Sequence, residues 1–126
     1  MQIWSVRSLA VLASVCALAG AVPGPFTMAA RQEGLVVEIA AERFSFTPSE
    51  IRTKTGTALD IRLRSDDTAH GFHIVGTDVD VRLPKRGKGV AQVTFTPTKA
   101  GRYTFECSQL CGAGHSFMRG VIIVSD

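Results

Sequence analysis

The chain has 126 residues, 45% of them hydrophobic and 20% charged, which allows one folded domain plus a short leader and excludes both a disordered chain and a large multidomain enzyme. Its 14 basic and 11 acidic residues give a formal net charge of +3, and because these charges are scattered, nucleic-acid binding has little support. Of three cysteines, Cys16 stands alone while Cys107 and Cys111 lie four residues apart, which indicates separate roles.

The N-terminal segment is predicted to be an export signal. Between Arg7 and Arg31 there is no charged residue, and positions 8–22 form an apolar stretch of the length expected for the hydrophobic region of a signal peptide. Small residues at 17–21 offer cleavage sites, and the Pro-Gly-Pro sequence at 23–25 would end a helix. We therefore expect residues 1–30 to be a cleaved signal peptide or a single membrane anchor, and residues 31–126 to form one exported domain, periplasmic or on the outer face of the cytoplasmic membrane.

The exported part reads as all-β, because short alternating segments are separated by turn residues from Leu35 onward. At 59–64 and 92–96 apolar and polar residues alternate, so one face of each strand points to a core. Along 101–107 the alternation places Cys107 at the inward end of a strand, and the apolar run 121–124 is typical of a covered strand. The pattern predicts a β-sandwich or barrel of about seven or eight strands, with no convincing helical periodicity.

A metal site is predicted around the two neighbouring cysteines. Cys107, Cys111, His115 and Met118 lie within 12 residues and combine thiolate, imidazole and thioether donors, a set that suits copper. Gly112 and Gly114 fit a tight loop that brings several donors to one point. An upstream strand end offers a further ligand, His70, with His73 as the alternative.

The number of metal ions is open at this stage. His70, Cys111, His115 and Met118 alone would complete a site for one copper ion, which would leave Cys107 idle. A free thiol next to a copper thiolate is a liability in an oxidising compartment, so we favour a site with two copper ions bridged by both sulfurs. Such a site has no open coordination position and suits electron transfer. A Cys107–Cys111 disulfide is the simpler alternative.

The motif Cys-Ser-x-Leu-Cys-Gly-x-x-His-Ser-Phe-Met, with Asp-x-x-His-Gly-Phe upstream, resembles the binuclear CuA domain of cytochrome c oxidase subunit II. The Phe-Ser-Phe-Thr-Pro segment at 44–48 also resembles cupredoxins. The resemblance covers roughly residues 35–125 and implies a cupredoxin-like Greek-key fold. Carried over by position, it implies two copper ions bridged by the thiolates of Cys107 and Cys111. It also implies His70 and His115 as terminal ligands, and Met118 and the backbone carbonyl of Gln109 as weak axial ligands.

The resemblance implies a function as well: accepting electrons from cytochrome c or a similar donor and passing them to the heme-copper subunit I. Such a chain is not catalytic alone.

Three features depart from the family pattern. Gln109 replaces the glutamate whose carboxylate helps to hold a magnesium ion, the sole tryptophan is Trp4 rather than a docking residue, and the N-terminal segment is at most one anchor. The alternative is a free-standing periplasmic cupredoxin that carries electrons or stores and delivers copper.

Overall fold

The computed structural model describes Gly24 and residues 34–126, so the predicted leader lies outside the described residues. Within them the protein is all-β, as predicted, with one short 3₁₀ turn, η1. The elements in chain order are β1 Leu35–Glu42, β2 Ser45–Thr47, β3 Glu50–Lys54, β4 Leu59–Ser65, β5 His70–Ile74, β6 Asp80–Leu83, β7 Ala91–Phe95, β8 Gly101–Glu106, η1 His115–Phe117 and β9 Arg119–Ser125. No helix long and apolar enough to cross a membrane occurs in this part of the chain.

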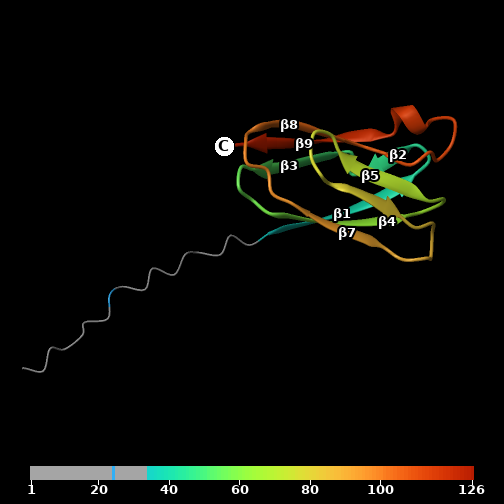
Figure 1. Ribbon diagram of the computed structural model, residues 1–126, viewed down its shortest axis with the longest axis horizontal. Coiled ribbons are helices and arrows are strands. Elements are labelled where there is room, and N and C mark those ends of the chain that lie inside the picture. Colours follow the sequence, from blue (N-terminus) through green and yellow to red (C-terminus); the bar gives the residue numbers. More distant parts are fainter. Residues whose placement is uncertain (1–23, 25–33) are drawn as a thin grey trace, which may run out of the picture. The chain divides into compact units, whose positions relative to one another are not determined.

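The nine strands form two sheets that face each other as a sandwich (Figure 1). One sheet has the order β2-β1-β4-β7 and the other β3-β9-β8-β5-β6. Two neighbouring pairs, β1 with β4 and β3 with β9, are parallel, and the other pairs are antiparallel. The strand count exceeds the predicted seven or eight; β2 has only three residues, too short for an alternating pattern to reveal.

The alternation in the sequence determines which side chains form the core. In β4, Leu59, Ile61 and Leu63 are buried between the sheets, whereas Arg62 and Arg64 are exposed. The run 121–124 is less covered than predicted, because Val121 and Ile123 are only half-buried while Ile122 and Val124 lie in the core. The final strand therefore also keeps a two-residue period.

Three phenylalanines from three strands pack together in the core. Phe46 contacts Phe72 and Phe105 edge-on at centroid distances of 5.8 and 5.4 Å, and Phe72 and Phe105 are 5.1 Å apart. His70 lies two residues before Phe72, and Cys107 lies two residues after Phe105. Because side chains two residues apart in a strand share a face, each candidate ligand points to the same side as its phenylalanine. The aromatic cluster thus fixes the two strand ends that carry the predicted ligands.

Candidate metal centre

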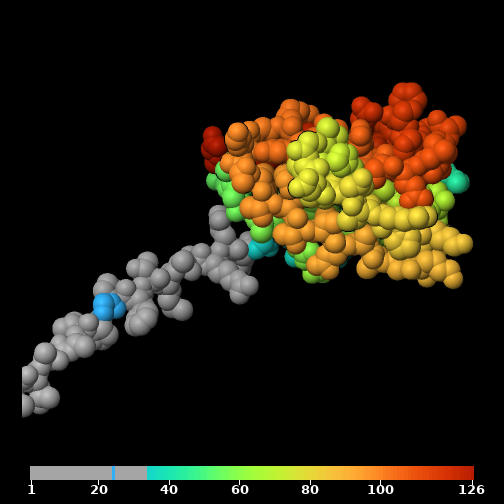
Figure 2. All heavy atoms as spheres, viewed as in Figure 1, coloured from blue at the N-terminus to red at the C-terminus, as the bar shows by residue number. Residues whose placement is uncertain are grey.

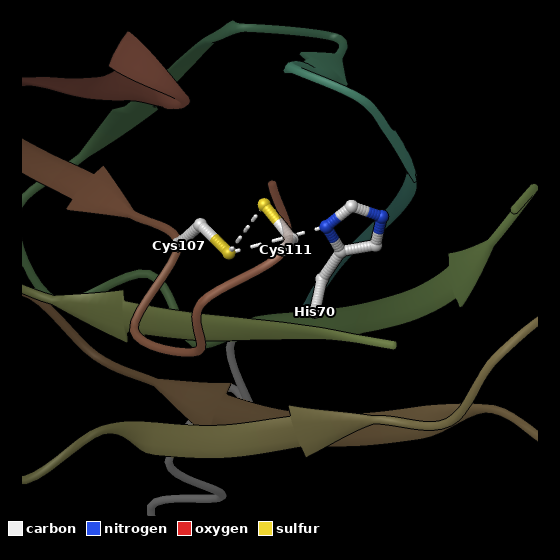
Figure 3. Close-up of side chains that lie close together, drawn as sticks. All are labelled: His70, Cys107 and Cys111. Atoms are coloured by element: carbon white, nitrogen blue, oxygen red, sulfur yellow. Dashed lines mark hydrogen bonds between the residues drawn. The ribbon is translucent and has the colours of Figure 1, made fainter. Parts of the chain in front are cut away.

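The loop between β8 and β9, which carries both cysteines, lies at the end of the sandwich opposite the C-terminus (Figure 1). Cys107 directly follows β8, and its backbone N–H donates to the carbonyl of Met118 at 3.0 Å, which closes the base of the loop 107–118. We call this segment the ligand loop. Both thiols are free and buried, and their Sγ atoms are 3.7 Å apart (Figure 3). The chain therefore presents two adjacent sulfurs rather than one.

His70, the first residue of β5, is fully buried and approaches from the opposite side (Figure 3). Its Nδ1 is 3.9 Å from Cys107 Sγ, and its Nε2 is 2.7 Å from Asp67 Oδ1. The carboxylate thus orients the ring with Nδ1 toward the sulfur, an arrangement common for histidine ligands of metals. His73, the alternative, has its Nδ1 2.9 Å from the carbonyl of Val79.

The other donors gather around the second sulfur. His115 Nδ1 is 3.7 Å from Cys111 Sγ, and the buried Met118 Sδ is 3.8 Å from the same atom. On the first sulfur, the carbonyl oxygen of Gln109 lies 3.0 Å from Cys107 Sγ. The six candidate donors therefore divide into two groups, each with a thiol, an imidazole Nδ1 and one weak donor. The weak donor is a carbonyl oxygen beside Cys107 and a thioether sulfur beside Cys111. Soft sulfur and imidazole donors in this combination fit copper.

Glycines allow the ligand loop to lie against its neighbours. A Cβ on Gly71 would be 2.7 Å from the backbone nitrogen of Gln109, so only glycine leaves room for the loop over β5. The N–H of Gly71 donates to Cys107 Sγ at 3.5 Å. Gly112 has φ +139°, which disfavours any other residue. The positive φ of Gly112 is consistent with the predicted tight bend of the loop.

Two titrating groups at the site are shifted from their ordinary values. Burial raises the pKa of the Cys111 thiol to about 11, with further contributions from Cys107 and Asp67. In the metal-free protein Cys111 therefore keeps its proton at neutral pH, and a cation that binds the thiolate must displace it. Burial by itself would raise the pKa of Asp67, but hydrogen bonds from His70 and from the backbone of Arg43 and Thr68 lower it overall.

Sequence reasoning missed one residue beside the site, Arg43. Its Nε donates to the carbonyl of Cys111 at 2.8 Å, and its backbone N–H donates to Asp67 Oδ2 at 3.0 Å. Arg43 lies 68 residues before Cys111 and outside every motif, so only the register of β1 against β4 could have placed it there.

The surface around the centre is partly apolar. Leu110 and Phe117 of the ligand loop are 79% and 80% exposed, so Phe117 does not cover the site. Figure 2 shows the ligand loop, orange to red, on the surface at this end of the molecule. Beside it opens a pocket of about 220 Å³ lined by Glu106, Cys107, His115, Ser116, Met118 and Arg119.

Comparisons with known proteins show the family to which the chain belongs. The pattern of the family described as "Cupredoxin-like domain" matches residues 8–124. Two Thermus thermophilus proteins named cytochrome c oxidase subunit 2 are each 35% identical over 91 residues, which is 71% of this chain but only 65% and 52% of theirs. The matched part therefore spans less than two thirds of these relatives.

Solved structures lead to the same family. A chain of a heme-copper terminal oxidase dimer superposes with a TM-score of 0.64 at 32% identity, covering 72% of this chain and 65% of that one. The periplasmic domain of subunit II of the Bradyrhizobium japonicum cytochrome oxidase superposes with a TM-score of 0.65, covering 73% of this chain and 84% of that one; at 17% identity it supports the fold alone. The predicted family and the cupredoxin-like fold are thus confirmed.

Proposed function

The chain belongs to the cupredoxin-like domain family, and on that premise we propose that it transfers single electrons through a binuclear copper centre, as subunit II, or a subunit II-like protein, of a cytochrome c oxidase. The observation that carries the proposal is the division of six donors into two groups around two sulfurs 3.7 Å apart. Two copper ions bound there would share one electron between them. Cys107 and Cys111 would supply the two thiolates that hold both copper ions.

The remaining donors take the terminal positions of the proposed centre. His70 and the Gln109 carbonyl serve the side of Cys107, and His115 and Met118 serve the side of Cys111. His70, Cys107 and Cys111 offer ligand atoms that all lie within 4.8 Å of one another, so a site for one copper ion would leave a second thiol at the same centre without a role. Both sulfurs are buried, and Asp67 keeps the His70 ring in place.

The proposal places the electron donor at the exposed ligand loop. With Trp4 in the leader, a tryptophan at the docking surface is absent from 34–126, and Leu110 and Phe117 supply the exposed apolar contact area instead. A cytochrome c or a similar carrier would dock there, and subunit I would receive the electron. We place the domain outside the cytoplasmic membrane, with residues 1–30 as its signal peptide or anchor.

Copper loading tests the proposal directly. The protein should bind two copper ions per chain and give a purple species whose EPR spectrum has seven hyperfine lines, because the unpaired electron is shared by two equivalent nuclei. His70→Ala should abolish this spectrum, whereas His73→Ala, removing a histidine from the same strand, should leave it intact. A blue species with one copper ion would contradict the binuclear centre. Rapid release of Cu(I) to an acceptor without reversible redox cycling would instead indicate copper storage or delivery.

A further inference from the structure

The turn between β1 and β2 connects the two halves of the proposed centre. Its first residue, Arg43, uses its backbone N–H to bind Asp67 Oδ2 at 3.0 Å, while the other carboxylate oxygen of Asp67 lies 2.7 Å from His70 Nε2. The turn is therefore fixed to the segment that holds His70.

The side chain of the same residue reaches the ligand loop. Arg43 Nε donates to the carbonyl of Cys111 at 2.8 Å, a contact that is partly buried although Arg43 as a whole is exposed. Among residues 34–126, this is the one hydrogen bond that joins the ligand loop to the four-stranded sheet. A hydrogen bond from a charged donor is stronger than one between neutral groups.

Within the loop, the hydrogen bonds near Cys111 are local. The N–H of His115 donates to the carbonyl of Gly112 at 3.1 Å, and that of Phe117 to the carbonyl of Gly114 at 3.0 Å. These bonds shape the 3₁₀ turn but do not fix the distance between Cys111 and His70. Gly71 and Asp80 hold the start of the loop through Cys107 and Ser108. The guanidinium of Arg43 adds a longer-range restraint at Cys111 itself.

We propose that Arg43 is a positioning residue that holds the loop bearing Cys111 against the segment bearing His70, and so slows the release of copper. The inference rests on the proposed function for its copper-dependent part. Arg43 touches neither the sulfurs nor the imidazoles, so it acts through the Cys111 backbone and through Asp67.

Arg43→Ala is the decisive variant, because it removes the guanidinium and keeps the backbone N–H that binds Asp67. In the metal-free protein, amide hydrogen exchange in 108–117 should become faster while exchange in β4 and β8 stays unchanged. In the copper-loaded protein, transfer of copper to a chelator should be about tenfold faster, the scale found for residues that orient metal ligands. Arg62→Ala, which removes an arginine paired with Asp60 on the outer face of β4, is the matched control.

The possible outcomes separate the two proposals. Loop exchange and copper release that match those of Arg62→Ala would overturn the role of Arg43. If Arg43→Ala does not fold, Arg43→Lys, which keeps the charge but loses the geometry of the guanidinium, should show loop exchange faster than the wild type, and unchanged exchange would overturn the role. Binding of fewer than two copper ions by the wild type would overturn the binuclear centre, while exchange in the metal-free protein would still decide the role of Arg43.

Discussion

Phe44 determines which residues can occupy one side of the ligand loop. Its ring lies against Gly112 and Gly114, so that a Cβ on Gly114 would be 2.8 Å from Phe44 Cε2 and would overlap Cδ2 and Cγ, near the stem of the side chain. The φ of Gly114, −94°, is one that any residue adopts. Glycine is therefore required at 114 for space and not for backbone conformation. The sequence alone indicates only that both glycines belong to the bend of the loop, because Phe44 lies far from them in the chain.

Gly114→Ala should consequently destabilise the protein through its contact with Phe44. We expect a loss of about 1–3 kcal/mol in the free energy of unfolding, the usual cost of inserting a methyl group into a packed region. In a Phe44→Ala background the same substitution should cost much less, because the overlapping ring is gone. Urea unfolding of the two single variants and the double variant measures this coupling. Additive losses would show that Phe44 does not impose the glycine.

At the scale of elements, the sequence predicted where the strands lie better than which strands pair with each other. The alternation at 59–64 became β4, and the stretch before Cys107 became β8, because each strand needs only a two-residue period to be recognised. The parallel pairing of β1 with β4 depends on contacts between distant segments, and no local pattern encodes it. Most candidate ligands lie in one local motif near the C-terminus, so the sequence predicts them. The position of Arg43 depends on the pairing of β1 with β4, so the sequence does not predict it.

The crossing of the ligand loop over β5 depends on Gly71. A Cβ at this position would lie 2.7 Å from the nitrogen of Gln109 and 2.9 Å from that of Ser108, and it would also overlap the Ser108 hydroxyl. Gly71→Ala should therefore push the loop away from β5 and lower the free energy of unfolding by about 1–3 kcal/mol. It should also abolish the two-copper spectrum. Denaturant unfolding and copper titration test both effects.

Ser108→Ala provides the control for Gly71. It removes the hydroxyl, which donates to Asp80 at 2.6 Å, but leaves the two backbone nitrogens in place. Combining it with Gly71→Ala should therefore not restore stability or copper binding. Recovery in the double variant would mean that the side chain of Ser108, and not the backbone of the loop, requires glycine on β5.

At the scale of the whole molecule, the strands and the core form one unit within residues 35–125. The buried apolar side chains run from Ile39 to Val124, and the first and last long strands, β1 and β9, both lie inside their sheets. The ligand loop lies at the end of the sandwich opposite the C-terminus (Figure 1), so a C-terminal tag leaves the proposed centre free.

The predicted exported domain, residues 31–126, should accordingly fold and bind copper without residues 1–30. All strands found among the described residues and all candidate ligands are retained, and the first 30 residues carry only one charge, Arg7, so the net charge changes little. We expect the melting temperature of the C-terminally tagged fragment to agree with that of the full chain within about 4 °C, a difference of less than ~1 kcal/mol. Circular dichroism melts and copper titrations of both proteins make the comparison. A fragment that stays unfolded, or that binds less copper than the full chain, would show that the first 30 residues contribute to the domain and are more than an export signal or anchor.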